Sequence, residues 1–322
     1  MPTIPINYDR FEGDNRSNSI YKTRHPRSVA LLGYGDRDYL LGSRFNDYID
    51  GGEGADYMWG GGGNDVYVVD NVNDEVYDTP GDGTYRSGTW DTVYSTVSYT
   101  LSDNIELLVL EGNAIRGTGN SGIDNVFGNS QHNILRTGGG DGSAIAGGDG
   151  NDRIYGSNST REDLRGDNGN DTIYGYRGED YLNGGNGNDR LYGGYDNDYL
   201  TGNSGDDLLV GSVGSSDREI DTYKGGSGRD TFSLTANRGS YSVLAYDNHG
   251  ASDYAKIEDF NLSEDRLQLV RGHSYGVTDA RRWRGLTGTA ITTGSGEDII
   301  AVLENVSNPR SINPSRHFYL VS

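Results

Sequence analysis

The sequence predicts an all-β fold, a parallel β-roll built from stacked short strands. Three observations lead to this prediction, and the first two are a nine-residue glycine and aspartate repeat that recurs in phase and an apolar residue at the eighth position of each repeat. The third is composition, because 51 of the 322 residues are glycine and 48 acidic residues outnumber 27 basic ones, for a formal charge of −21. Without the repeat, such a composition would favour disorder. Cations that neutralise the carboxylates are therefore expected to stabilise the fold.

The composition also limits the classes of function. The acidic charge argues against nucleic acid as a partner, because its phosphates would be repelled. No apolar run approaches the roughly 18 residues of a membrane span. Residues 1–15 lack the basic and then apolar pattern of a signal peptide. The chain has no cysteine, which excludes disulfides and thiolate metal sites.

Two arrays carry the repeat. The first begins at Gly33 with four abutting nonapeptides, GYGDRDYLL, GSRFNDYID, GGEGADYMW and GGGGNDVYV, and the second runs from GGDGNDRIY (147–155) to GGSGRDTFS (225–233). Within the second array, residues 156–165 form an irregular unit and residues 211–224 a unit with an insertion. The sixth positions are Asp38, Asp47, Asp56, Asp65, Asp152, Asp171, Asp180, Asp189, Asp198, Asp207 and Asp230.

The nine-residue frame has a physical reading as half a coil. Its glycines permit a tight turn with positive φ, and its last three or four residues alternate like a short strand with one apolar side chain inward. Two units make an 18-residue coil, and stacked coils repeat every ~4.8 Å. Aspartates 18 residues apart then lie one above another, as Asp38 over Asp56, Asp47 over Asp65, and Asp171 over Asp189 and Asp207. Such columns need cations between their rungs, and calcium accepts both carboxylate and carbonyl oxygens.

At these residues the chain resembles the repeats-in-toxin (RTX) family, whose nonapeptide GGxGxDxUx, with U a large apolar residue, binds calcium in a parallel β-roll. The resemblance implies several calcium ions as cofactors. Each ion takes the aspartate and the carbonyls of positions 2 and 4 of one turn. It also takes the aspartate and the carbonyls of positions 1 and 3 of the turn 18 residues on.

Carried over to this chain, the resemblance implies specific ligand sets. One ion would lie among Tyr34, Asp36, Asp38, Gly51, Glu53 and Asp56. Another would lie among Gly185, Gly187, Asp189, Gly202, Ser204 and Asp207. The other implied ligands are Asp47, Gly60, Gly62, Asp65, Gly148, Gly150, Asp152, Gly166, Asn168, Gly169, Asp171, Asp180, Gly184, Asn186, Asp198 and Asp230.

Between the arrays the glycine frame lapses. Residues 90–112 alternate polar residues with Val, Tyr and Leu, which predicts strands that continue the stack. Residues 119–146 keep the frame loosely, with Asp124, Asn133 and Ser143 at the sixth positions. Since Asn and Ser bring no negative charge, these coils are expected to bind metal weakly. We expect one continuous roll, and two separately folding rolls are the alternative.

The pattern divides the chain into five segments: an N-terminal cap or arm over 1–32, the first RTX array over 33–68, spacer coils over 69–146, the second array over 147–233, and a C-terminal cap or secretion domain over 234–322. The last segment resembles the β-rich cap of bacterial, notably cyanobacterial, members, which would cover the final sheet edge. Its tail, SRHFYLVS, is either a type I secretion signal or a last cap strand. Residues 281–285, RRWRG, are either a carbohydrate contact or cap surface with Trp283 packed.

Tyrosines recur at the seventh and ninth positions, and two readings are open for them. They form a contact surface for polysaccharide or another copy of the chain, or their rings cover neighbouring strand backbone. The residues concerned are Tyr39, Tyr48, Tyr57, Tyr155, Tyr174, Tyr192 and Tyr199.

The sequence offers no catalytic constellation. It contains no HExxH or GxSxG motif, and its five histidines have no metal-ligand spacing. We therefore expect a non-enzymatic, secreted, calcium-binding β-roll that folds on extracellular calcium, with a structural role in a surface layer, a matrix or adhesion. Calcium, further copies of the chain and surface polysaccharide are its expected partners. The alternative is a polysaccharide-acting enzyme with a groove over residues 70–118, or the carbohydrate-binding module of a secreted enzyme.

Overall fold

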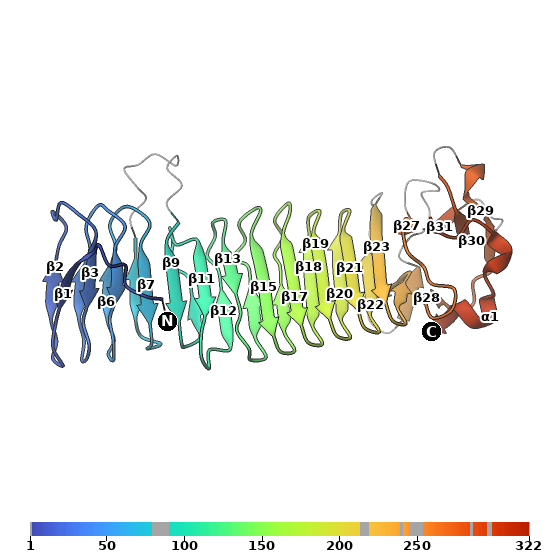
Figure 1. Cartoon of the computed structure of the whole chain (residues 1–322). Helices are drawn as coiled ribbons and strands as arrows, with labels where there is room; N and C mark the ends of the chain where they lie inside the picture. The colour runs from blue at the N-terminus through green and yellow to red at the C-terminus, as the bar shows by residue number, and fades with distance from the viewer. Residues whose placement is uncertain are drawn as a thin grey trace. The chain divides into compact units, whose positions relative to one another are not determined.

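The computed structural model describes residues 2–78, 90–212, 219–238, 241–244, 246, 254–283, 286–294 and 298–321. They form two compact units, Met1–Asp149 and Gly150–Ser322. Each unit consists almost entirely of short strands that stack against one another in sheets (Figure 1). The predicted fold class, an all-β parallel β-roll, is confirmed.

In unit 1, successive half-coils contribute strands to different sheets, and neighbours within each sheet are parallel. One sheet has the order β1 (Asp9–Glu12), β3 (Val29–Leu32), β5 (Tyr48–Asp50), β7 (Val66–Val69), β9 (Thr92–Ser95), β11 (Leu107–Leu110), β13 (Asn125–Phe127) and β15 (Ala144–Asp149). The half-coils between them form β2 (Ser19–Tyr21), β4 (Tyr39–Leu41), β6 (Tyr57–Trp59) and β8 (Glu75–Tyr77), and further on β10 (Tyr99–Thr100), β12 (Arg116–Thr118) and β14 (Ile134–Arg136).

The roll of unit 1 begins before the first nonapeptide. Strand β1 pairs with β3, and β2 pairs with β4. All four residues of β3, VALL, are buried. Residues 9–32 therefore already contribute rungs to the stack, and the glycine frame is not needed to form them.

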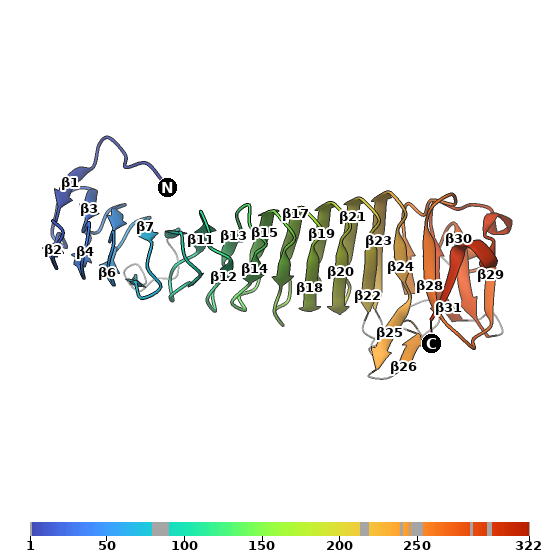
Figure 2. The same cartoon turned by 90° about the horizontal axis from the view of Figure 1, so that it is seen from below.

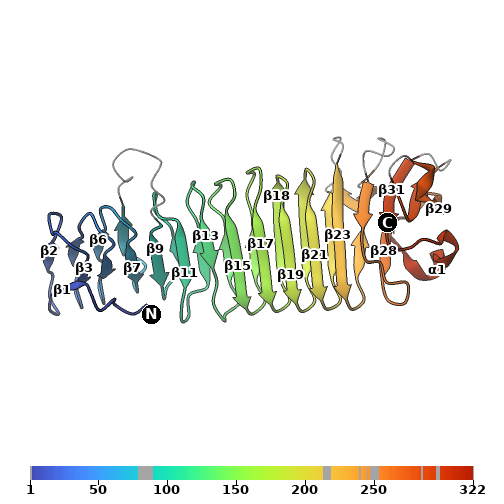
Figure 3. The same ribbon diagram turned by 45° about the horizontal axis from the view of Figure 1, so that its top comes forward.

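Unit 2 is also a parallel stack, and many of its strands are longer (Figure 3). One sheet begins with β17 (Asp163–Asn168), β19 (Tyr181–Asn186), β21 (Tyr199–Ser204), β23 (Ile220–Ser227) and β27 (Tyr254–Ile257). The other has the order β16 (Arg153–Tyr155), β18 (Thr172–Arg177), β20 (Arg190–Tyr195), β22 (Leu208–Ser212), β24 (Thr231–Ser233), β28 (Arg266–Val270) and β32 (Phe318–Val321).

Strand length differs between the two arrays. Strand β4 covers three residues, as the alternating end of the nonapeptide predicts, whereas β18 covers six. The extra residues are positions 1 to 3 of the following nonapeptide, because these also stay in register with the next coil, as Tyr176 does with Gly194. From β17 to β21 only the corner from position 4 to position 6 thus remains outside the strands.

The apolar eighth positions form the core of each unit. Leu40 lies opposite Met58, which lies opposite Val76, and in unit 2 Ile173 lies opposite Leu191. No eighth-position side chain of the regular repeats is more than 1% exposed. The neighbouring seventh and ninth positions are mostly partly or fully exposed. One inward side chain per half-coil is therefore enough to fill the narrow interior.

The last strands of unit 2 change direction. Strand β31 (Asp298–Leu303) pairs in parallel with β27, and the antiparallel strands β30 (Thr289–Thr293) and β29 (Tyr275–Asp279) follow at the end of that sheet. The antiparallel pair β25 (Thr235–Arg238) and β26 (Tyr241–Leu244) stands beside the stack (Figure 2). Three short helical turns are η3 (Ala280–Arg282), η4 (Pro309–Ser311) and α1 (Pro314–His317).

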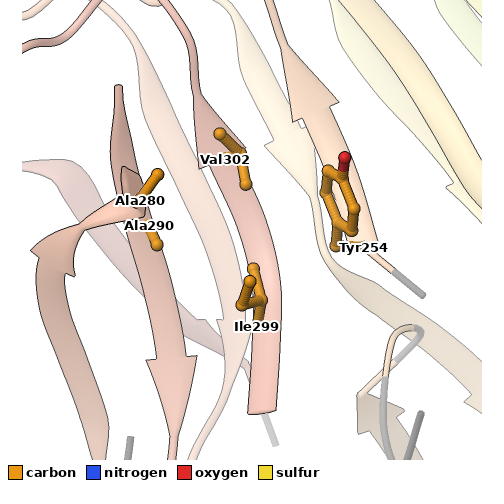
Figure 4. Packing of buried hydrophobic residues seen from close by; sticks show 5 residues of the cluster. All are labelled: Tyr254, Ala280, Ala290, Ile299 and Val302. Carbon is orange, nitrogen blue, oxygen red and sulfur yellow. The ribbon is translucent and has the colours of Figure 1, made fainter. Parts of the chain in front are cut away.

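An apolar cluster fills the space between these final strands. Tyr254, Ala280, Ala290, Ile299 and Val302 are buried together (Figure 4), and Trp283 packs against them partly buried. Arg284 and Gly285, the last two residues of the RRWRG patch, lie outside the described residues. The tail residues FYLV form β32, which pairs with β28. The segment therefore has the β-rich, apolar character expected of a cap, and its capping role stays a prediction.

Candidate metal centre

The sixth-position aspartates stack in columns, as their spacing predicts. The backbone N–H of Asp38 donates to Asp56 Oδ1 over 2.8 Å, and that of Asp189 donates to Asp207 Oδ1 over 2.8 Å. The same bond joins Asp47 to Asp65, Asp152 to Asp171, Asp171 to Asp189, Asp180 to Asp198 and Asp207 to Asp230. One carboxylate oxygen of each rung is thus used to tie two coils together.

In most of these rungs the other carboxylate oxygen is buried without a hydrogen-bond partner. Among the described residues this holds for Oδ2 of Asp38, Asp56, Asp65, Asp91, Asp180, Asp189, Asp198, Asp207 and Asp230. An ionised carboxylate is costly to bury unless its charge is compensated. Each of these oxygens therefore needs a cation or a proton.

The unpartnered oxygen faces the turn backbone. A Cβ atom placed on Gly33 would overlap both Asp38 Oδ2 and the carbonyl oxygen of Gly51 in the next coil. The same overlap, with the carboxylate in its own turn, recurs at Gly184 with Asp189 and at Gly202 with Asp207. Glycine at position 1 thus leaves room in which a carboxylate oxygen and a backbone carbonyl oxygen of the next coil approach each other. Mixed oxygen ligands of this kind suit Ca²⁺.

Burial raises the pKa of the stacked aspartates. Loss of hydration raises the pKa of Asp56 to about 7 and that of Asp180 and Asp189 to about 8. Neighbouring rungs add to the shift, since Asp207 and Asp171 both raise the pKa of Asp189. Without a metal ion these carboxyl groups would therefore be partly protonated at neutral pH, and a bound cation would hold them ionised.

The nonapeptide turns with an unpartnered Oδ2 share one backbone feature, a positive φ at position 2. We call them open turns. The residues at position 2 include Tyr34 at 81°, Tyr176 at 78° and Asn203 at 76°, although left-handed backbone disfavours side chains other than glycine. The others are Gly52, Gly61, Gly185, Gly194 and Gly226. This strained conformation at non-glycine residues suggests a functional constraint on the turn.

In other turns the N–H of position 2 closes the site, and we call these closed turns. The N–H and hydroxyl of Ser43 both donate to the Asp47 carboxylate, and the N–H of Asn129 donates to Asn133 Oδ1 over 2.8 Å. In the spacer, amide groups also take up carbonyl oxygens: Asn120 Nδ2 donates to the carbonyls of Ser102 and Ile105, each over 2.7 Å. Hydrogen bonds there satisfy several of the oxygens that face the turn, although Asp124 Oδ1 is buried without a partner.

One column of unit 2 meets a tyrosine hydroxyl instead. Asp221 Oδ1 accepts the N–H of Asp198, so Asp221 continues the column past the insertion. Its Oδ2 accepts the hydroxyl of the fully buried Tyr246. The Tyr246 hydroxyl lies 2.8 Å from that of Tyr223, which also accepts the N–H of Gly211. Residues 213–218 of the insertion lie outside the described residues.

The structure brings the two ligand sets named from the resemblance into contact. In the first, the N–H of Glu53 donates to the Tyr34 carbonyl over 2.7 Å, beside Asp38 and Asp56. In the second, the N–H of Gly187 donates to the Ser204 carbonyl over 2.7 Å, across the two coils that hold Asp189 and Asp207. Asp47 differs, since hydrogen bonds reach both of its carboxylate oxygens.

Several column members were missed by the sequence reasoning. They are Asp74, Asp91, Glu162, Asp221 and Asp265, each of which accepts the backbone N–H of the rung before it or donates to the rung after it. Asp74 follows Asp56 by 18 residues, a signal that could have found it. Glu162 precedes Asp180 by the same 18 residues. Longer intervals hide the others behind insertions: 26 residues from Asp65 to Asp91, 23 from Asp198 to Asp221 and 35 from Asp230 to Asp265.

The recurring tyrosines stack on one another. The ring centroids of Tyr155 and Tyr174 lie 5.4 Å apart and those of Tyr174 and Tyr192 4.9 Å apart, with planes within 8° of parallel. In unit 1, Tyr57 stacks between Tyr39 and Tyr77. Because neighbouring rings cover the faces of the central ring, its edge is what remains for solvent or a partner.

These features define a class: a parallel β-solenoid whose turns pair buried carboxylate and carbonyl oxygens for cations. The family model described as the RTX calcium-binding nonapeptide repeat (4 copies) matches residues 32–67, 118–142, 144–160, 157–191 and 183–216. Over these residues the chain carries RTX calcium-binding nonapeptide repeats, and they bind several calcium ions. No curated protein matches it. Among the described residues, no helix has the length and apolar character needed to span a membrane.

Proposed function

We propose that this calcium-binding structural protein is secreted and serves in a surface layer, an extracellular matrix or adhesion, with external calcium as its folding switch. The observation that supports the proposal is the series of buried, unpartnered Asp oxygens in open turns. At low calcium their mutual repulsion and burial oppose folding. Calcium sites of extracellular modules have dissociation constants of about 10⁻⁴–10⁻³ M, so millimolar external calcium would fill them.

The proposed ions lie between successive open turns of one column. In unit 1 one ion lies between the turns of Asp38 and Asp56, which share the bond from Asp38 N–H to Asp56 Oδ1. In unit 2 ions lie between the turns of Asp189 and Asp207, Asp207 and Asp230, and Asp180 and Asp198. The turn carbonyls and the Asp carboxylates supply the oxygen ligands, as the resemblance implies.

A titration of chelator-treated protein with calcium, followed by far-UV circular dichroism, tests the folding switch. We expect a cooperative gain of β structure at submillimolar to millimolar calcium and a much weaker response to magnesium, which demands a smaller octahedral site. A spectrum that is equally β-rich in chelator and in calcium would contradict the switch.

The arrangement of the partly exposed tyrosine rows favours a structural role over catalysis. Rings that stack face to face along a column, as Tyr155, Tyr174 and Tyr192 do, stabilise the coil stack and leave few ring faces for sugars. They also present repeated ring edges to another copy of the chain. The polysaccharide-acting alternative placed its groove over residues 70–118, of which 79–89 lie outside the described residues.

Two assays separate these functions. Sedimentation of the calcium-loaded protein, with chelated protein as the control, should reveal calcium-dependent assembly if the role is structural. Incubation with a panel of acidic and neutral polysaccharides should release no shorter products. Degradation of a polysaccharide by the monomeric protein would overturn the structural proposal in favour of the enzyme.

A further inference from the structure

One column of unit 1 leaves the nonapeptide frame at Asp65. The turn before it, that of Asp47, is closed by Ser43, so both Asp47 oxygens already accept hydrogen bonds. The next rung is Asp91, 26 residues on, whose Oδ1 accepts the N–H of Asp65 over 2.6 Å. The open turn of Asp65 therefore lies next to no second open turn of the nonapeptide repeats with which to share an ion.

A carboxylate from outside the repeats reaches this open turn. Asp78 follows strand β8 and belongs to no nonapeptide. Its Oδ1 accepts the N–H of Gly61, at position 2 of the Asp65 turn, over 2.8 Å. In the turn of Asp38 the next coil brings the Gly51 carbonyl close to the carboxylate. At Asp65 the next coil brings the side chain of Asp78.

Asp65, Asp78 and Asp91 form a compact cluster. Each offers one carboxylate oxygen, and these oxygens lie within 4.8 Å of one another. Since Ca²⁺ binds oxygens at about 2.3–2.6 Å, one ion can contact all three. Asp65 and Asp91 are fully buried, and Oδ2 of each has no hydrogen-bond partner. Three carboxylates so close together repel strongly unless a cation lies among them.

We propose that Asp65, Asp78 and Asp91 bind a calcium ion at a site distinct from the nonapeptide sites, in which a third carboxylate replaces turn carbonyls. The ligands are oxygens only, which favours Ca²⁺ over Zn²⁺ and other nitrogen- and sulfur-seeking metals. Because calcium affinity rises with the number of charged ligands, this site fills at lower calcium than the open-turn pairs. It joins the first array to the spacer coils, since Asp65 lies in the former and Asp91 in the latter.

The test measures calcium stoichiometry on the full chain by native mass spectrometry and equilibrium dialysis. The variant Asp78→Asn removes the carboxylate from outside the repeats and leaves every nonapeptide intact. The matched control is Asp103→Asn, which changes an exposed carboxylate of the same unit. We expect Asp78→Asn to bind one calcium fewer than wild type and to lose the tightest phase of the titration, and Asp103→Asn to match wild type.

The outcomes separate this site from the nonapeptide sites. If wild type binds several ions and Asp78→Asn binds the same number with the same tight phase, the site at Asp78 is refuted and the open-turn sites stand. If wild type binds no calcium, both fail. If Asp78→Asn does not fold, wild-type crystals soaked in terbium provide the test. An anomalous peak in contact with Asp78 supports the site. If terbium occupies other sites of the chain but not this one, the proposal is overturned.

Discussion

At the scale of single residues, Asp206 and Asp207 have opposite environments although they are adjacent. Asp207 is buried, with Oδ2 unpartnered in an open turn, whereas Asp206 is exposed and pairs with Arg229 over 2.6 Å. We expect Asp207→Asn to weaken calcium binding at its site by about tenfold or more, because a charged ligand is lost while the bond to the Asp189 N–H can persist. Calorimetric titration with calcium measures the effect.

The variant Asp206→Asn is the control for this prediction. An exposed ion pair contributes about 0–1 kcal/mol, so Asp206→Asn should keep wild-type calcium affinity and nearly wild-type thermal stability. If both variants lose calcium affinity equally, the net charge of the surface controls binding, and the open-turn geometry does not.

The tetrapeptide GNSG shows a limit of prediction from the local sequence, because its two copies form different turns. It occurs at 119–122 and at 202–205. Asn203 adopts a positive φ of 76°, and the turn is open at Asp207. Asn120 does not adopt a positive φ, and its N–H donates to Asp124 Oδ2. The difference comes from the neighbouring coils, since Asn203 is paired with Gly185 and Gly226, both at positive φ. The period predicted which carboxylates stack, but the local sequence does not determine which turns open.

At the scale of the turn and strand, two glycines with nearly equal φ separate strain from crowding. Gly187 has φ 121° and Gly139 has φ 119°. A Cβ at Gly187 would overlap the Gly169 carbonyl oxygen of the preceding coil, whereas nothing lies within 4 Å of one at Gly139. We expect Gly139→Ala to cost about 1–3 kcal/mol from backbone strain alone. Gly187→Ala should cost more, because it also pushes two coils apart.

Chemical denaturation in saturating calcium measures both glycine variants. Their difference reports how closely the coils must approach at the open turn. If Gly139→Ala and Gly187→Ala lose the same unfolding free energy, the preceding coil moves away from Gly187 without loss of stability. The close approach of the two coils would then be unimportant for stability.

The tyrosine stack of unit 2 supports a second prediction at the element scale. Tyr174 stacks between Tyr155 and Tyr192 at 5.4 and 4.9 Å. An aromatic pair contributes about 0.5–1.5 kcal/mol beyond its buried area, so Tyr174→Ala should lower the melting temperature of the calcium-loaded protein clearly. Tyr174→Phe keeps the ring and should change it little. A large loss in Tyr174→Phe would instead assign the stabilisation to the hydroxyl.

The elements themselves were largely predictable, because one inward residue per nine positions is a strong periodic signal. It predicted the strands of both arrays and the buried eighth positions from Leu40 to Phe232. It did not predict β1 to β3, which pair in the roll without a glycine frame. It also did not predict that β18 extends through the turn, since that depends on backbone register with β20 and not on side chains.

At the scale of the whole molecule, the excess of acidic residues and the small core act together. The chain has a formal charge of −21, and much of its buried polar surface is carboxylate. Its stability therefore depends on what neutralises the columns. Calcium does so at neutral pH, and protons are the only substitute in a chelator. This comparison leads to a prediction about pH whose sign distinguishes the columns from ordinary surface carboxylates.

The metal-free protein should become more stable as the pH falls. An aspartate has a pKa of about 3.9 in an unfolded chain, whereas burial raises that of Asp56 and Asp230 to about 7 and that of Asp189 to about 8 in the fold. The folded state therefore binds more protons between about pH 4 and pH 8, and its stability falls as the pH rises through this range. Calcium competes with the same protons, so its affinity should increase from pH 5 to pH 8.

Thermal unfolding at pH 5 and pH 8, with and without calcium, measures both effects in four samples. In metal-free buffer the β signal should be stronger and the melting temperature higher at pH 5 than at pH 8. The increase in melting temperature that calcium causes should be larger at pH 8. Surface carboxylates in ion pairs have lowered pKa values, as Asp279 beside Arg281 has, and would shift stability in the opposite direction. A metal-free protein that is more stable at pH 8 would therefore show that the columns are hydrated and ionised, and that burial of their carboxylates does not oppose folding.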